Sequence, residues 1–150
     1  MTVEITVHSL EETNALAHKL AQLVRAQDTI TLEGDLGVGK TTFTQAFAKG
    51  LGITRVVNSP TFTIMKQYVG RIPLNHLDVY RLANSDEDLG WEEIFYGEAV
   101  TLVEWAKLIE EDLPSERLAI EIKRVSDTAR VFHITALGKR YEQLCEELIQ

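Results

Sequence analysis

The chain has 150 residues, of which 45% are hydrophobic and 25% charged, which is ordinary for a water-soluble globular protein with a real core. No stretch approaches the roughly 18 apolar residues of a membrane helix, and the N-terminal segment is acidic, so we expect a cytoplasmic protein without a signal peptide or membrane contact. The one cysteine, Cys145, excludes an internal disulfide and is expected to be a buried structural thiol. Because no linker, repeat or low-complexity tract interrupts the chain, we expect one domain over residues 1–150.

In chain order, the pattern first predicts a strand over 3–8, a helix over 9–26, a strand over 28–34 and a helix over 41–49. A β-hairpin within 61–82 and short helical pieces within 85–97 follow. The rest of the chain is predicted to form a buried central strand over 99–105, a second hairpin from 117–125 to 129–137, and a helix over 139–150. Ser9 and Glu12 have the spacing of a capping box, and Gly50 and Gly52 end the second helix. Early strand–helix alternation followed by hairpins predicts an α/β fold. We expect a P-loop NTPase-like three-layer sandwich with a mixed, partly antiparallel central sheet covered by helices.

Charge is unevenly distributed along the chain. The formal net charge is −8, but residues 85–116 hold eleven acidic residues and one basic residue, a local charge of −10 that leaves +2 for the remainder. Nucleic-acid-binding proteins neutralise phosphates with a basic face, so tight independent binding of RNA or DNA is not expected. The acidic segment is either a solvated face or a docking surface for a basic protein partner.

Residues 34–41, GDLGVGKT, match the phosphate-binding pattern G-x-x-x-x-G-K-[ST] at every fixed position. Glycines let successive N–H groups point at phosphate oxygens, and the following helix adds the partial positive charge of its N-terminus. Lys40 can reach the β- and γ-phosphates, the Thr41 hydroxyl can ligate Mg²⁺, and Thr42 can contact the α-phosphate. The segment therefore predicts a nucleotide-phosphate site, a feature that kinases, switches, motors and helper ATPases all share.

Two acidic residues are candidates for the metal and for the attacking nucleophile, because phosphoryl transfer requires carboxylates for both. Asp78 ends the β run LNHLD and Glu104 ends the run TLVE. The carboxyl ends of strands are where an open α/β sheet binds its ligands. Either residue can hold Mg²⁺ while the other orients water, and each can instead be an ordinary strand-end acid.

Five more residues near these segments have open roles. Thr61 lies where P-loop switches place a γ-phosphate sensor, although Ser-Pro-Thr also forms a simple turn. His76 alternates with apolar neighbours and is expected to be structural. Trp105 is expected to pack, and its place after Glu104 would also suit a wall of the site. The pair Tyr80–Arg81 can offer a charge to phosphate or lie at the surface.

Five blocks carry a resemblance to a known family: GDLGVGKTTFTQ, NSPTFTIMKQY, LNHLDVYRL, LGWEEIF and LVEWAKL, in this order and spacing. Together they resemble the TsaE (YjeE) family of bacterial P-loop ATPases, over about residues 4–137. Members of that family are required, with two partner proteins, to make N6-threonylcarbamoyladenosine at position 37 of tRNAs that read codons beginning with adenosine. The five blocks are far more specific than the phosphate-binding loop alone.

The resemblance implies that the nucleotide is ATP and that Mg²⁺ is held by Thr41 and Glu104. It further implies that Asp78 is an essential acid near the phosphates, so Lys40, Asp78 and Glu104 are the expected catalytic residues. SPTFT would be a switch-like loop.

The resemblance also implies an adenine site between the start of the first helix and the last hairpin turn. Taken together, the residues expected to contact the nucleotide are Leu10, Gly37, Val38, Gly39, Lys40, Thr41, Thr42, Thr61 and Ala129, the last of which adjoins Arg130.

Two protein partners follow from the same resemblance. Family members do not transfer the threonylcarbamoyl group; they bind the transferase subunit TsaD (Kae1-like) and its dimerising partner TsaB, and their ATP hydrolysis is thought to reset that complex. We therefore expect a weak Mg²⁺-dependent ATPase that meets tRNA mainly through TsaD and TsaB. The acidic segment is a candidate contact surface, which charge reversal at Asp86, Glu87 and Asp88 would test.

Two other classes share the loop. A small-molecule or nucleoside kinase, the main alternative, usually adds an acceptor pocket and an arginine-bearing lid, whereas here a hairpin follows the loop's helix and no arginine cluster occurs. A GTP-dependent switch reads guanine with an N-K-x-D element, and this chain contains no Asn-Lys pair. The sequence therefore favours an accessory ATPase of tRNA modification.

Overall fold

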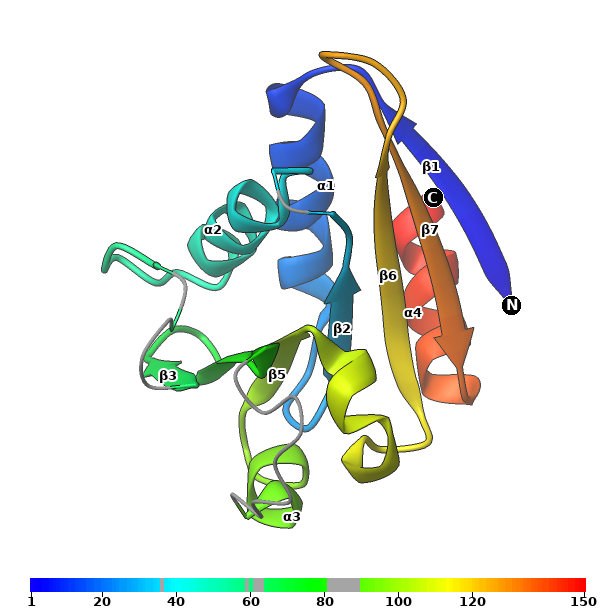
Figure 1. Ribbon diagram of the computed structural model, residues 1–150. Coiled ribbons are helices and arrows are strands. Elements are labelled where there is room, and N and C mark those ends of the chain that lie inside the picture. The colour runs from blue at the N-terminus through cyan, green and yellow to red at the C-terminus, as the bar shows by residue number, and fades with distance from the viewer. Residues whose placement is uncertain (36, 59, 61–63, 81–89) are drawn as a thin grey trace.

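A computed structural model describes the chain except residues 36, 59, 61–63 and 81–89, and shows helices packed on a mixed β-sheet (Figure 1). The strands are β1 (Thr2–Val7), β2 (Thr29–Glu33), β3 (Met65–Tyr68), β4 (Leu74–Asp78), β5 (Val100–Glu104), β6 (Arg117–Arg124) and β7 (Arg130–Leu137). The helices are α1 (Leu10–Leu23), α2 (Lys40–Gly50), α3 (Trp91–Phe95), α4 (Lys139–Ile149) and the 3₁₀ helix η2 (Ala106–Asp112). Among these elements, η2 is the one that the sequence pattern did not predict.

The sheet has the strand order β1-β7-β6-β2-β5-β4-β3. Strands β6, β2, β5 and β4 are parallel to one another, whereas β3 pairs antiparallel with β4, and β7 pairs antiparallel with both β6 and β1. Both predicted hairpins are present, as β3–β4 and β6–β7. The apolar run at 99–105 forms β5, which lies between β2 and β4. The predicted α/β fold with a partly antiparallel sheet is confirmed.

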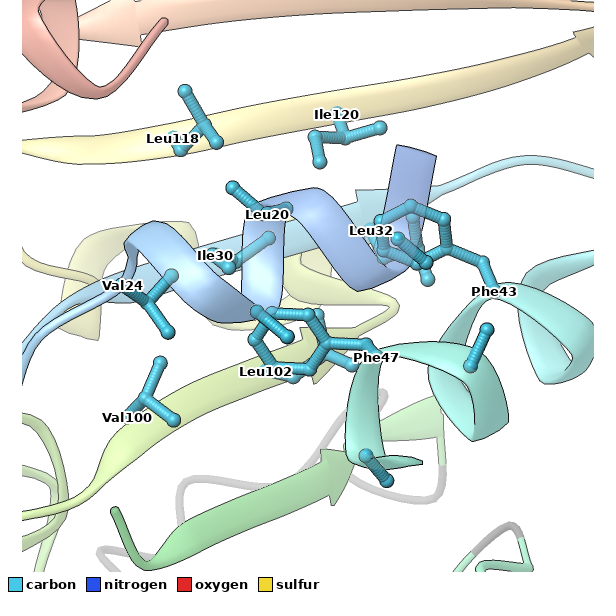
Figure 2. Packing of buried hydrophobic residues seen from close by; sticks show 14 of the residues in the cluster. Leu20, Val24, Ile30, Leu32, Phe43, Phe47, Val100, Leu102, Leu118 and Ile120 are labelled. Atoms are coloured by element: carbon cyan, nitrogen blue, oxygen red, sulfur yellow. The ribbon is translucent and has the colours of Figure 1, made fainter. Parts of the chain in front are cut away.

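Each face of the sheet has its own apolar cluster, because successive side chains of a strand point to opposite faces. The larger cluster packs against α1, α2 and α4. Figure 2 shows its centre: Leu20 of α1 and Val24 directly after it, Ile30 and Leu32 of β2, Phe43 and Phe47 of α2, Val100 and Leu102 of β5, and Leu118 and Ile120 of β6. The smaller cluster covers β4 and β5 with α3 and η2, and contains no described residue of β1, β6 or β7. The third layer is therefore built over the β4–β5 half of the sheet.

The start of α1 is fixed by the cap that the sequence predicts. The Ser9 hydroxyl accepts the Glu12 N–H at 3.1 Å and the Glu12 carboxylate accepts the His8 N–H at 3.1 Å, so the predicted cap is present with its return bond one residue earlier than expected. In α4, Cys145 is fully buried as predicted, and burial raises the pKa of its thiol.

Among the described helices, none is long and apolar enough to cross a bilayer.

Candidate nucleotide site

The phosphate-binding loop joins the end of β2 to the start of α2. Gly37 and Gly39 have φ values of 80° and 114°, in the left-handed region that favours glycine. A Cβ at Gly34 would lie 2.9 Å from the backbone oxygen of Ile122, so this close approach also requires glycine. The helix begins after Gly39 without a side-chain cap. Its first N–H groups and positive dipole end are thus available to an anion, which is the geometry that phosphates use.

Lys40 is a buried cation, 8% exposed, that forms no ion pair with any described carboxylate. Its Nζ lies 4.4 Å from the centroid of the Trp105 ring, and the Tyr80 ring packs against that ring at a centroid distance of 4.9 Å. Trp105 directly follows β5 with a φ of 62° and forms the wall that its place in the sequence suggested. Among the described residues, the aromatic face is the contact shown for this ammonium group, which leaves the group free to pair with an anionic ligand.

Glu104, at the end of β5, is held by a histidine of the neighbouring strand. His76 Nε2 lies 2.8 Å from Glu104 Oε2, and the two side chains are 2% and 7% exposed. His76 Nδ1 is buried without a hydrogen-bond partner in the described chain, so the tautomer with N–H on Nε2 fits, and this N–H donates to the carboxylate. The pair fixes the direction of Glu104 and leaves its other oxygen, Oε1, without a hydrogen bond to a described residue.

A narrow cavity beside α2, without room for a water molecule, is lined by both predicted metal ligands. Its lining residues are Thr41 and Thr44 of α2, Val57, Asn58, His76 and Glu104. No cluster of three or more His, Cys, Asp or Glu side chains in the described chain forms a cation cage. Magnesium needs no such cage, because it keeps several waters and takes one or two protein oxygens together with substrate phosphates. The Thr41 hydroxyl and the Glu104 carboxylate are oxygen donors of the kind that Mg²⁺ takes, and the narrow cavity that they line would have to widen to admit the ion.

Asp78, at the end of β4, lies opposite Glu104 in the strand register. It is half-buried, its Oδ1 accepts the Tyr80 N–H at 3.1 Å, and its own N–H donates to the Ile64 oxygen at 2.8 Å. Both predicted carboxylates thus lie at the sheet edge that carries the loop. Asp78 is not among the residues that line the cavity of Thr41 and Glu104.

A larger cavity of about 580 Å³ adjoins the loop, between the start of α1 and the β6–β7 turn. Its volume is in the range of small-molecule sites. Among the predicted nucleotide contacts, it is lined by Leu10, Gly37, Val38, Gly39 and Thr42; other lining residues include Ser9, Asp127, Thr128 and Arg130. The structure therefore brings together the two segments that were expected to hold the adenine.

Arg130 joins the β6–β7 turn to the loop. Its Nε donates to the Val38 oxygen at 2.9 Å, and its Nη1 donates to the oxygens of Ser126 and Ala129 at 2.7 and 2.9 Å. Ala129 itself does not line the cavity, whereas Thr128 and Arg130 on either side of it do. Within this turn, Ala129 shapes the backbone and Arg130 supplies the side chain next to the loop.

Some predicted or overlooked positions need separate mention. Thr61 and Arg81 lie outside the described residues, so their predicted roles stay predictions. His76, which the sequence predicts to be structural, lines the cavity of Thr41 and Glu104, as do Thr44 and Asn58, which are not among the predicted site residues. Period-two spacing from His76 to Asp78, which puts both on one face of β4, and helical spacing from Thr41 to Thr44 are the signals that point to them.

A protein-family model described as "Threonylcarbamoyl adenosine biosynthesis protein TsaE" matches residues 7–132. The chain belongs to the TsaE family. The tRNA threonylcarbamoyladenosine biosynthesis protein TsaE of Bacillus subtilis (strain 168) is 61% identical over 139 residues, which cover 92% of this chain and 88% of that protein. The Streptomyces coelicolor protein of the same name is 40% identical over 136 residues, covering 84% and 91% of the two chains. The crystal structure of Bacillus subtilis YdiB superposes with a TM-score of 0.88 at 52% identity, over 99% of this chain and 95% of that one.

These comparisons confirm the family that the five sequence blocks indicated. The solved structure and the family model cover nearly the whole chain, including the loop, β4 and β5. The described edge of the sheet is therefore part of the fold that this chain shares with the TsaE family. The kinase alternative finds no support among them.

Proposed function

We propose that this TsaE-family protein is a weak Mg²⁺-dependent ATPase whose hydrolysis cycle serves the formation of N6-threonylcarbamoyladenosine in tRNA. The observation that carries the proposal is the shared sheet edge: the buried Lys40, without an ion pair to any described carboxylate, lies over the ring of Trp105, the residue that follows the histidine-held Glu104. The names of the TsaE relatives support the pathway. In this proposal the protein works in the cytoplasm and does not itself transfer the threonylcarbamoyl group.

The loop residues hold the triphosphate. Backbone N–H groups of Gly37 to Lys40 and the start of α2 bind the β- and γ-phosphates, Lys40 neutralises charge that develops between them, and Thr42 contacts the α-phosphate. The adenosine occupies the 580 Å³ cavity beside Leu10, and Arg130 keeps the loop in place through the Val38 oxygen. Binding thus orients the γ-phosphate toward the ends of β4 and β5.

Hydrolysis requires a positioned water. Its oxygen attacks the γ-phosphorus, the bond to the β–γ bridging oxygen breaks, and ADP and phosphate leave, while one of the two carboxylates, Asp78 or Glu104, accepts the water's proton. Thr41 and Glu104 would hold Mg²⁺, which supplies Lewis-acid stabilisation of phosphate charge when bound. His76 keeps Glu104 aimed into the cavity, so the carboxylate does not have to be ordered during the reaction.

The partners in this proposal are TsaD and TsaB, and tRNA is reached mainly through them. A chain with a net charge of −8 is poorly suited to neutralise an RNA backbone alone. Charge reversal would test the acidic segment as a contact surface at three positions, Asp86, Glu87 and Asp88. These positions lie outside the described residues.

A reconstituted tRNA-modification assay with purified TsaD, TsaB and this protein tests the proposal. Lys40→Ala should retain the fold by circular dichroism, lose at least about a hundredfold in ATP hydrolysis, and support one round of modification but not repeated rounds. Lys139→Ala, an exposed change at the start of α4, is the matched control and should behave as wild type. Repeated turnover with Lys40→Ala at the wild-type rate would refute a role for hydrolysis in resetting the complex.

A further inference from the structure

Residues 36–77 form an acid-free segment, with five basic residues and no acidic residue, within a chain of net charge −8. Lys40 belongs to the proposed phosphate site, and the Arg71 guanidinium donates to the oxygens of Ala21 in α1 and of Val24, which follows that helix. The other three, Lys49, Arg55 and Lys66, form no ion pair within the described part of the chain. The segment therefore presents uncompensated positive charge on an acidic protein.

Two of these cations line one cavity. Lys49, near the end of α2, and Arg55, in the loop that follows, border a space of about 250 Å³. The remaining lining residues carry no charge: Gln45, Ala48, Ile53, Thr54, Val56 and Val57. Arg55 is preoriented by the ring of Tyr68, whose centroid lies 5.7 Å from the guanidinium carbon, and Val56 is 78% exposed. This Lys49–Arg55 cavity combines two cations with apolar walls.

The Lys49–Arg55 cavity and the candidate metal site share one lining residue, Val57. This residue lines both the Lys49–Arg55 cavity and the cavity that contains Thr41 and Glu104. Its backbone oxygen accepts a hydrogen bond from Gln45 Nε2 at 3.1 Å, which ties the loop to α2. An occupant of the Lys49–Arg55 cavity would therefore touch the same loop that borders the metal cavity.

We propose that the Lys49–Arg55 cavity is a docking site for an acidic side chain of a protein partner, flanked by an apolar residue that packs on Val56. A carboxylate complements the two cations, and the uncharged walls accept the aliphatic part of the partner's side chain. RNA is disfavoured as the occupant, because a backbone track needs a row of cations and stacking aromatics, and the rest of this chain is acidic. The inference rests on the proposed function only in naming TsaD–TsaB as the partner.

Charge reversal with a matched control tests the docking site. Lys49→Glu/Arg55→Glu and the control Lys123→Glu/Lys139→Glu change the net charge equally, and the control positions lie on β6 and α4. By titration calorimetry in low salt, the first variant should bind purified TsaD–TsaB at least about tenfold more weakly, and the control within about twofold of wild type. Both should keep the basal ATPase rate and nucleotide affinity within about twofold, since none of the four residues lines the nucleotide or metal cavities.

Each other outcome has a definite meaning. Wild-type binding by Lys49→Glu/Arg55→Glu would overturn the docking site while leaving the proposed function intact, whereas a wild-type protein that fails to bind TsaD–TsaB would refute the named partner and this inference together. If wild type alone binds tRNA and only that binding is lost in the variant, the surface is an RNA contact and the proposal is wrong. If the charge-reversed variant has a lower melting temperature, the neutral variant Lys49→Gln/Arg55→Gln takes its place and should still bind the partner about threefold or more weakly. Unchanged partner binding by this folded neutral variant would equally overturn the docking site.

Discussion

The hydrogen bond between His76 and Glu104 can be tested with two amide substitutions at one position. In His76→Gln, the amide nitrogen occupies roughly the place of Nε2 and can still donate to Glu104. In His76→Asn, the shorter side chain puts its amide nearer the place of Nδ1, where the structure shows no hydrogen-bond partner in the described chain. The two variants therefore differ mainly in whether the Glu104 carboxylate keeps its donor.

The expected energies follow from burial. The side chains of His76 and Glu104 are 2% and 7% exposed, so water cannot readily replace a lost donor. Removing the partner of a buried carboxylate forfeits a charge-assisted hydrogen bond of about 1.5–3 kcal/mol and leaves part of its desolvation uncompensated. We expect the free energy of unfolding to fall by about 3 kcal/mol in His76→Asn and by about 1 kcal/mol in His76→Gln.

Stability is measured by urea unfolding of the nucleotide-free protein, and metal binding by Mg²⁺ titration of the complex with a non-hydrolysable ATP analogue. A freed Glu104 should weaken apparent Mg²⁺ affinity about tenfold in His76→Asn, with little change in His76→Gln. Leu74→Ala is the control, because it opens a cavity on the same face of β4, far from its carboxyl end, and should cost about 2–5 kcal/mol without altering Mg²⁺ affinity. Equal Mg²⁺ affinity in the Asn and Gln variants would show that His76 does not position Glu104.

Three further predictions concern the loop, the packing of α1 on α2, and the buried thiol. Arg130→Met removes the hydrogen bond to the Val38 oxygen, so nucleotide affinity measured by calorimetry should fall about tenfold, and an unchanged affinity would exclude this role. Gly50→Ala puts a methyl group 2.5 Å from the Ala21 Cβ and should lower the urea-unfolding free energy by about 1–3 kcal/mol at unchanged nucleotide affinity; wild-type stability would contradict the packing. Cys145 should resist a thiol reagent until urea unfolds the chain, and rapid labelling in native buffer would show that it is not buried. Because its pKa is raised on folding, the thiol's contribution to stability is complete below the ordinary thiol pKa and is lost as pH rises through the folded value, so alkaline destabilisation should be smaller in Cys145→Ala.

The geometry of the glycine-rich loop was predictable because it is local in sequence. Residues 34–41 specify the turn, the left-handed glycines and the start of α2 without reference to any distant residue. The positions of Asp78 and Glu104 at strand ends could also be predicted, because an acidic residue at the end of a buried β run lies at the rim of the sheet. The capped start of α1 followed in the same way from Ser9 and Glu12.

The contacts between strands were not predictable, because they depend on register. His76 meets Glu104 only because β4 and β5 are parallel neighbours with Asp78 opposite Glu104, and no pattern within either strand encodes that offset. The stacking of Lys40 on Trp105 likewise depends on a left-handed φ at a non-glycine residue, which propensity argues against. Arg130 reaches Val38 only because β6 lies next to β2, a pairing of strands far apart in the sequence.

The candidate site has two sides, the loop with the β6–β7 turn and the ends of β4 and β5, and helix α2 contributes residues to the site between them. The loop is secured from one side by the β6–β7 turn through Arg130, whereas the ends of β4 and β5 carry the carboxylates on the other side. Helix α2 contributes Lys40 and Thr41 at its start, and near its other end Lys49 borders the proposed docking cavity. Because Val57 lines both this cavity and the cavity of Thr41 and Glu104, and the Gln45 amide holds its backbone to the middle of α2, a partner bound beside Lys49 would contact the same short loop that borders the predicted metal ligands.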